Sequence, residues 1–225
     1  MNIIRKHAPL AAALTLCIAA APALAQESID KVNGSITAES GQSYGSLETV
    51  NGSIKIESKA HTGDASTVNG SIKVADDVVT GDLETVNGGI RAGTGLRAGD
   101  IETVNGSIFV DRGGSLKAVS TVNGGIGLVD TDLSEGIETV SGDVTVGVGS
   151  HIKGGIKVEK PNSSWMPIQI GKRTPPRIII GPNAVVEGPL VFEREVKLYV
   201  HSSARIGKVT GATPIPYSTP TAPAD

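Results

Sequence analysis

The sequence predicts an all-β protein that folds as a single β-solenoid, a parallel β-helix with about 18 residues per coil. Three observations lead to this fold class. The pattern Val-Asn-Gly-Ser/Gly-Ile begins at Val32, returns at Val50 and then keeps the same interval along the chain. Each copy is rich in β-branched residues, Gly and Asn rather than in helix formers. Apolar and polar residues also alternate within each copy, which is typical of strands. We expect roughly seven regular coils, then about two to three irregular C-terminal coils.

The repeat sets the length of the predicted array. Six successive intervals of equal length separate the seven copies, the last of which is degenerate. One copy cannot bury its apolar side alone, so neighbouring coils must stack and stabilise one another. With about 4.8 Å between paired strands, seven coils span roughly 34 Å. The copies begin at Val32, Val50, Val68, Val86, Val104, Val122 and Val140.

Alternation within a copy predicts which side chains face the core. In the second copy, Val50, Gly52, Ile54 and Ile56 share one phase, which we expect to point inward. Leu47 is a further aliphatic residue that we expect in the core. Because Leu47 lies an odd number of positions before Val50, the chain is predicted to turn a corner between them.

Two polar columns follow from the same period. Stacked asparagines are expected to form a ladder of amide hydrogen bonds, and loss of the central Asn87 is predicted to cost about 1 kcal/mol or somewhat more, as for a buried hydrogen bond. The Asn-Gly pair also suits a corner, because both residues tolerate positive φ. The second column consists of threonines, which could alternatively form a ligand surface like the threonine arrays of ice-binding solenoids. The asparagines are Asn33, Asn51, Asn69, Asn87, Asn105 and Asn123, and the threonines are Thr49, Thr67, Thr85, Thr103, Thr121 and Thr139.

A third column is acidic. Four of its positions hold glutamate, and serine at two others relieves repulsion between like charges on adjacent strands. Such a row could bind a divalent cation through carboxylate oxygens, although a solvated acidic edge is the interpretation we prefer. The glutamates are Glu48, Glu84, Glu102 and Glu138, and the serines are Ser66 and Ser120.

The N-terminal segment has the pattern of a secretory signal peptide. Arg5 and Lys6 precede an apolar stretch, and Ala23-Leu24-Ala25 supplies the small residues of a cleavage site before Gln26. Removal of the two basic residues takes the net charge from −3 to −5 and leaves no cysteine in the mature chain. We therefore expect export to the periplasm or cell surface and no integral membrane segment after cleavage. The acidic balance and the 3% aromatic content argue against nucleic-acid binding.

Beyond Val146 the pattern becomes irregular, and a spacing of 12 residues separates Val144 from its apparent next copy at Ile156. A Pro-rich loop with the only Trp follows, and Trp165 is expected either to contact a sugar or subunit or to cover the solenoid. The predicted organisation is a signal peptide at 1–25, solenoid repeats at 26–159, the loop at 160–177, C-terminal coils at 178–210 and a disordered tail at 211–225.

The repeats, with their Glu-Thr-Val-Asn-Gly-Ser-Ile grammar, resemble the adhesin family of exported bacterial β-solenoids over about residues 30–158. The C-terminal coils, from Ile178 to Val209, are similar to the winding pattern of bactofilins, which form polymers in bacterial cells. The first resemblance implies an envelope role and the second implies self-assembly. Neither implies a catalytic residue.

No catalytic, cofactor-binding or metal-binding residue is predicted, because the three histidines of the mature chain share no ligand spacing and no cysteine accompanies them. The leading hypothesis is a non-catalytic cell-envelope module for adhesion or scaffolding, with an envelope glycan or protein as partner. The alternative is a filament protein that associates end to end through unpaired strands. A polysaccharide-active enzyme is the third hypothesis, with acidic residues on one face as candidates. They are Asp76, Asp77, Asp130 and Asp132.

Overall fold

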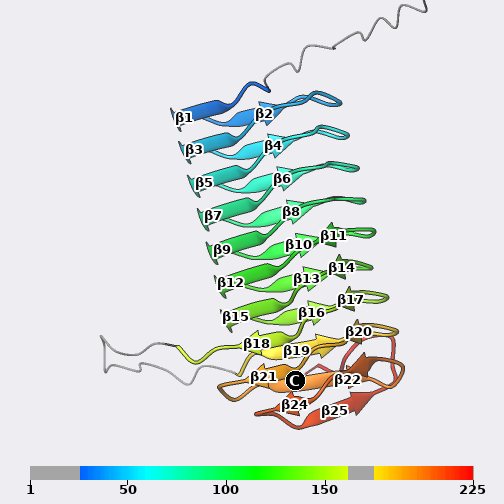
Figure 1. Cartoon of the computed structure of the whole chain (residues 1–225). Helices are drawn as coiled ribbons and strands as arrows, with labels where there is room; N and C mark the ends of the chain where they lie inside the picture. The colour runs from blue at the N-terminus through cyan, green and yellow to red at the C-terminus, as the bar shows by residue number, and fades with distance from the viewer. Residues whose placement is uncertain (1–25, 162–174, 225) are drawn as a thin grey trace, which may run out of the picture.

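The computed structural model describes residues 26–161 and 175–224, and these residues form a solenoid of parallel β-sheets (Figure 1). Two sheets have ten strands each, so the chain completes ten coils, and a third sheet has five. The predicted fold class is confirmed. The predicted signal peptide and Trp165 lie outside the described residues. Across these ranges, no helix has the length and hydrophobicity needed to cross a membrane.

Sheets A and B extend along the whole stack and account for most of the strands. Sheet A contains β1 (Ile29–Asn33), β3 (Leu47–Asn51), β5 (Ala65–Asn69), β7 (Leu83–Asn87), β9 (Ile101–Asn105), β12 (Val119–Asn123), β15 (Ile137–Ser141), β18 (Ile156–Val158), β21 (Leu190–Phe192) and β24 (Val209–Thr210). Sheet B contains β2 (Ile36–Ala38), β4 (Ile54–Ile56), β6 (Ile72–Val74), β8 (Ile90–Ala92), β10 (Ile108–Val110), β13 (Ile126–Leu128), β16 (Val144–Val146), β19 (Arg177–Ile180), β22 (Lys197–His201) and β25 (Pro214–Tyr217).

Sheet C is the narrow third side of the coil, and in the N-terminal half it is reduced to single bridges from Ser43 through His61, Val79 and Arg97 to Ser115. Its two-residue strands begin at Ser115, while the regular sequence repeat still continues. They are β11 (Ser115–Leu116), β14 (Asp132–Leu133), β17 (His151–Ile152), β20 (Val185–Val186) and β23 (Arg205–Ile206).

The register explains the apparent change of spacing after Val146. Ile156 pairs in sheet A with Ile137, and Ile152 pairs in sheet C with Leu133, so both belong to a coil one residue longer than the regular ones. The short interval between Val144 and Ile156 therefore joins strands on different sides of the solenoid and is not a shortened coil. The longer interval from Val144 to its sheet B partner Ile178 contains the Pro-rich segment.

The orientation of the valine column differs from the prediction. Leu47 and Thr49 of β3 are 0% and 4% exposed, whereas Val50 is 42% exposed. Strand β3 runs without a corner from Leu47 to Asn51, so Leu47 and Thr49 share the inner face and Glu48 and Val50 the outer face. The corner lies after Asn51, and Ile54 and Ile56 are buried as expected. The predicted inward valine and the predicted corner between Leu47 and Val50 are both wrong.

From the second coil onward the corner glycines are required for close approach and not for left-handed backbone, whereas Gly34 in the first coil has a φ of +112°. A Cβ on Gly70 would lie 1.9 Å from the carbonyl oxygen of Gly52 in the preceding coil, and a Cβ on Gly88 would lie 1.9 Å from that of Gly70. Neither Gly70 nor Gly88 has a positive φ. Positive φ recurs instead at the turn that follows sheet B. The residues there are Gly41, Lys59, Asp77, Gly95, Gly113, Asp130, Gly149 and Asn183.

The C-terminal coils at 178–210 are present, and the solenoid continues beyond them. Pro214–Tyr217 forms β25, which pairs with β22, and the Tyr217 hydroxyl donates a hydrogen bond to the Ile180 carbonyl at 3.2 Å. The prediction of a disordered tail is therefore wrong for these four residues. Proline suits a strand at the edge of a sheet, where the side away from its neighbour needs no N–H donor.

Candidate binding face on sheet A

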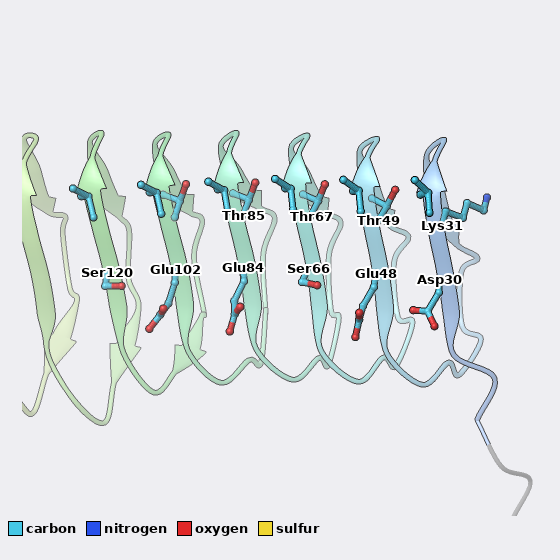
Figure 2. Close-up of a pocket in the computed structure, with 17 residues that line it drawn as sticks. Asp30, Lys31, Glu48, Thr49, Ser66, Thr67, Glu84, Thr85, Glu102 and Ser120 are labelled. Atoms are coloured by element: carbon cyan, nitrogen blue, oxygen red, sulfur yellow. The ribbon is translucent and has the colours of Figure 1, made fainter.

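The outer face of sheet A carries two parallel columns of side chains (Figure 2). They arise because residues such as Glu48 and Val50 alternate with the buried Leu47 and Thr49 along each strand. We call the columns the valine stripe and the acidic column. The valine stripe is Val32, Val50, Val68, Val86, Val104 and Val122, and the acidic column is Asp30, Glu48, Ser66, Glu84, Glu102, Ser120 and Glu138.

The two columns enclose a shallow trough on this face. The trough has a volume of about 640 Å³ and is lined by side chains from β1, β3, β5, β7, β9 and β12. Five valines of the stripe, from Val50 to Val122, are each 40–42% exposed, which makes a continuous apolar row. An apolar row beside a row of carboxylates is suited to a partner that is itself extended and amphipathic.

The threonine column faces the interior behind this trough. The Thr85 hydroxyl donates to the carbonyl oxygen of Gly70 at 2.8 Å, so it binds the corner glycine of the preceding coil. The same bond recurs at 2.9–3.2 Å for Thr67, Thr103 and Thr121, and Thr49 makes it at 3.0 Å. These threonines are 3–4% exposed. The alternative that the threonine array forms a ligand surface is therefore wrong for these positions.

The predicted asparagine ladder borders the valine stripe. The side-chain nitrogen of each asparagine donates to the side-chain oxygen of the asparagine one coil earlier, at 2.9–3.1 Å from Asn51 to Asn123. All six asparagines are exposed, which differs from the prediction of a buried bond at Asn87. The ladder fixes the spacing of the corners at the edge of the face.

Stacked negative charge perturbs the centre of the acidic column. Glu84 and Glu102 are directly paired on adjacent strands. Burial raises the pKa of the Glu102 carboxyl, and the negative charges of Glu84, Asp100 and Asp82 raise this pKa further. The positive charge of Lys117, whose Nζ lies 2.8 Å from Asp100 Oδ2, lowers the pKa of Glu102 and so opposes this shift. Carboxylates on adjacent rungs of the column, such as Glu84 and Glu102, therefore repel one another.

The two acid pairs considered for polysaccharide chemistry lie on different coils. Asp76 accepts a hydrogen bond from the Thr94 amide at 2.7 Å, and this bond holds the pKa of Asp76 below its usual value. Asp77 and Asp130 occupy the positive-φ position of coils that are three rungs apart, or about 14 Å. This separation exceeds that of the paired carboxylates of glycosidases. Within the described ranges, no three His, Cys, Asp or Glu side chains gather in a metal-binding group.

The three histidines make separate local contacts. His61 lies on a single bridge of sheet C. His151 Nε2 is 2.6 Å from Glu187 Oε1, and His201 Nδ1 is 2.8 Å from Ser203 Oγ. Each histidine is therefore placed on a different coil with its own neighbours.

A basic column on sheet B was not anticipated from the sequence. Lys55, Lys73 and Arg91 are the exposed central residues of β4, β6 and β8, and they stack in register. The guanidinium carbon of Arg91 lies 5.0 Å from the centre of the Phe109 ring on the next strand. The signal that could have revealed this column is the same repeat interval, applied to the position between two buried aliphatic residues.

No protein-family model, curated protein or solved structure matches this chain. The class of the protein is therefore defined by its own fold, a parallel β-solenoid of ten coils with a long, regular outer face.

Proposed function

We propose that this protein is a non-catalytic, exported β-solenoid that acts as an adhesion-like or scaffolding module of the cell envelope. The observation that carries the proposal is the trough on sheet A, which extends over six strands and presents the valine stripe beside the acidic column. A surface of this length fits a macromolecular partner, such as an envelope glycan or protein, better than a small molecule.

The rigidity of the scaffold supports a binding role. Each of the five coils from Asn51 to Asn123 contributes one asparagine bond at its corner and one threonine bond to the preceding corner, as at Asn87 and Thr85. Buried aliphatic residues such as Leu83 and Ile90 fill the interior between the sheets. A face held in this way needs little ordering when it binds, which favours affinity.

The predicted signal peptide supports the proposed location. Cleavage after Ala25 would release a chain without cysteine, so backbone and side-chain ladders must stabilise it in place of disulfides. The test is fractionation of cells that produce the full chain, with the N-terminus of the product determined by mass spectrometry. Product in the envelope fractions that begins at Gln26 is expected, and uncleaved product in the cytoplasm would contradict export.

Binding is tested with isolated cell-wall sacculi and with detergent-free envelope membranes as probes. The wild-type mature chain should co-sediment with one of them, and Val86→Glu/Val104→Glu, which changes only exposed side chains of the trough, should not. Val148→Glu is the matched control, because Val148 is 53% exposed and does not line the trough. Equal binding by all three proteins, or by none, would contradict the role of the trough.

End-to-end assembly is the second candidate, and the edge strands β1 and β2 favour it because they end sheets A and B on one side. The opposite end is less suited to pairing. The carbonyl oxygen of Tyr217 accepts a hydrogen bond from the Ser202 amide of the preceding coil, so the polar backbone groups of Tyr217 face β22. Because this orientation alternates along a strand, the backbone nitrogens of Pro214 and Pro216 face away from β22, toward any added strand. Proline has no N–H to donate to an added strand. Axial filaments in negative-stain microscopy would support this candidate.

A further inference from the structure

Two oppositely charged columns lie on different sheets of this solenoid. The acidic column on sheet A includes Glu84 and Glu102 on neighbouring strands, and the basic column on sheet B consists of Lys55, Lys73 and Arg91 on three successive strands. Over these strands each column places one charge per coil, whereas Ser66 and Ser120 interrupt the acidic column and Phe109 follows Arg91 in the basic one. Both therefore repeat at the strand spacing of about 4.8 Å.

Each column has an electrostatic cost in the single chain. Like charges directly opposite one another on adjacent strands are destabilising, and this arrangement occurs at Glu84–Glu102 and at Lys73–Arg91. Among the described residues, none of these four side chains makes an ion pair. Lys55 differs because it pairs with Glu57 at 2.5 Å. Burial raises the pKa of Glu102, and the neighbouring negative charge of Glu84 raises this pKa further.

We propose that the acidic column of one copy of this chain docks side by side on the basic column of a second copy. Glu84 and Glu102 of one copy then face Lys73 and Arg91 of the other. Because both pairs are separated by one strand spacing, the charges of these two rungs match when the two solenoid axes are aligned, and each copy supplies what offsets the repulsion in its neighbour.

Apolar groups adjoin both columns and would complete the contact. The valine stripe runs beside the acidic column, and Phe109 continues the basic column beyond Arg91. The two faces are different surfaces of the same molecule, so the contact is heterologous: one copy keeps a free basic column and the other keeps a free acidic column. The association therefore propagates laterally, and it is distinct from pairing of the end strands.

Salt and charge reversal test this inference by sedimentation velocity on residues 26–225, which contain every strand of the solenoid. At about 10 mM salt the wild-type sedimentation coefficient should rise with concentration, and at about 1 M salt, where the Debye length is about 3 Å, it should fall to the monomer value. Glu84→Lys/Glu102→Lys and Lys73→Glu/Arg91→Glu should each remain monomeric, because each has two faces of the same sign.

Mixing the two variants is the decisive arm. The reversed sheet A of the first variant is complementary to the reversed sheet B of the second, so an equimolar mixture should regain the wild-type association. Glu27→Lys/Glu195→Lys is the control for net charge: it changes the charge as much as the first variant, alters two exposed residues outside both columns, and should associate like the wild type. Circular dichroism confirms the fold of each variant.

Three results would overturn the inference. The first is a wild-type chain that stays monomeric at low salt. If such a monomer binds poly-lysine through its acidic column, the partner of that column is a different cationic chain and not a second copy. The second is association that neither reversal affects, which would indicate end-to-end contact. The third is a mixture that stays monomeric although both variants are folded.

Discussion

Replacing Gly88 by alanine tests why glycine occupies the corner between β7 and β8. A Cβ at this position would lie 1.9 Å from the carbonyl oxygen of Gly70 in the preceding coil, a distance that two non-bonded atoms cannot adopt. One of the two backbone segments must therefore move. The same carbonyl accepts the buried Thr85 hydroxyl at 2.8 Å, so displacement of Gly70 also weakens that hydrogen bond.

The expected loss of stability follows from these two contacts. Overpacking of a well-packed interior costs about 1–3 kcal/mol, and a buried hydroxyl that loses its partner costs about 1–3 kcal/mol. We expect Gly88→Ala to lower the free energy of unfolding by about 3 kcal/mol, a large share of the stability of a typical domain. Urea denaturation followed by circular dichroism measures this loss as a shift in the transition midpoint.

Gly125→Ala is the matched control. Gly125 follows the corner glycine of a later coil, its φ is not positive, and the nearest atom to an added Cβ is 3.5 Å away. This substitution should change the stability by less than about 0.5 kcal/mol. Gly88→Asn separates the two explanations for the corner, because asparagine tolerates left-handed backbone but carries the same Cβ. If Gly88→Asn or Gly88→Ala is as stable as Gly125→Ala, the close-approach explanation is refuted.

Four further substitutions test the columns of the solenoid. Thr85→Val should destabilise the protein by about 1–2 kcal/mol, because the Gly70 carbonyl loses its donor. Thr139→Val should be neutral or stabilising, because the buried Thr139 hydroxyl has no partner among the described residues. Equal urea midpoints for the two variants would contradict the role of the threonine hydrogen bond. Asn87→Ala should cost about 0.5–1 kcal/mol in the same assay, since water competes for an exposed ladder, and a much larger loss would indicate that the ladder is buried. The pKa of Glu102 is raised in the fold, so the ionised form of this side chain destabilises the protein. Glu102→Gln should therefore raise the melting temperature at pH 7, by an amount that corresponds to up to about 0.5 kcal/mol. This gain should shrink as the pH falls through the raised pKa, and it should vanish below the pKa of glutamate in the unfolded chain, about 4.3. A gain that is unchanged at low pH would contradict the electrostatic cause.

The fold class could be predicted because a solenoid converts a sequence period directly into a stack. The repeat interval fixes which residues pair, as Thr67 with Thr85 and Asn69 with Asn87, and no long-range information is needed. The alternation also identifies the buried Ile54 and Ile56 correctly. A change in coil length is harder to predict from the sequence. Ile152 and Ile156 have the spacing of two residues within one copy of the repeat, but they lie on different sheets, C and A.

The inner and outer faces of sheet A could not be predicted from hydrophobicity. Hydrophobicity alone predicts that valine, the more apolar residue, lies inside. Thr49 is buried instead, because its hydroxyl donates to the Gly34 carbonyl at 3.0 Å. Only the path of the chain brings that carbonyl to the threonine. With Thr49 inside, Val50 must lie outside, and the candidate binding face is a consequence of this exchange.

Thiol labelling of residues 26–225 tests this exchange directly, because these residues include no cysteine. Val86 is 40% exposed and the adjacent Thr85 is 4% exposed. With both proteins folded and held at high salt, iodoacetamide should alkylate Val86→Cys rapidly and should alkylate Thr85→Cys only after denaturation. Rapid alkylation of Thr85→Cys together with protection of Val86→Cys would place the valine stripe in the core and would remove the face on which both the proposed function and the proposed lateral contact depend.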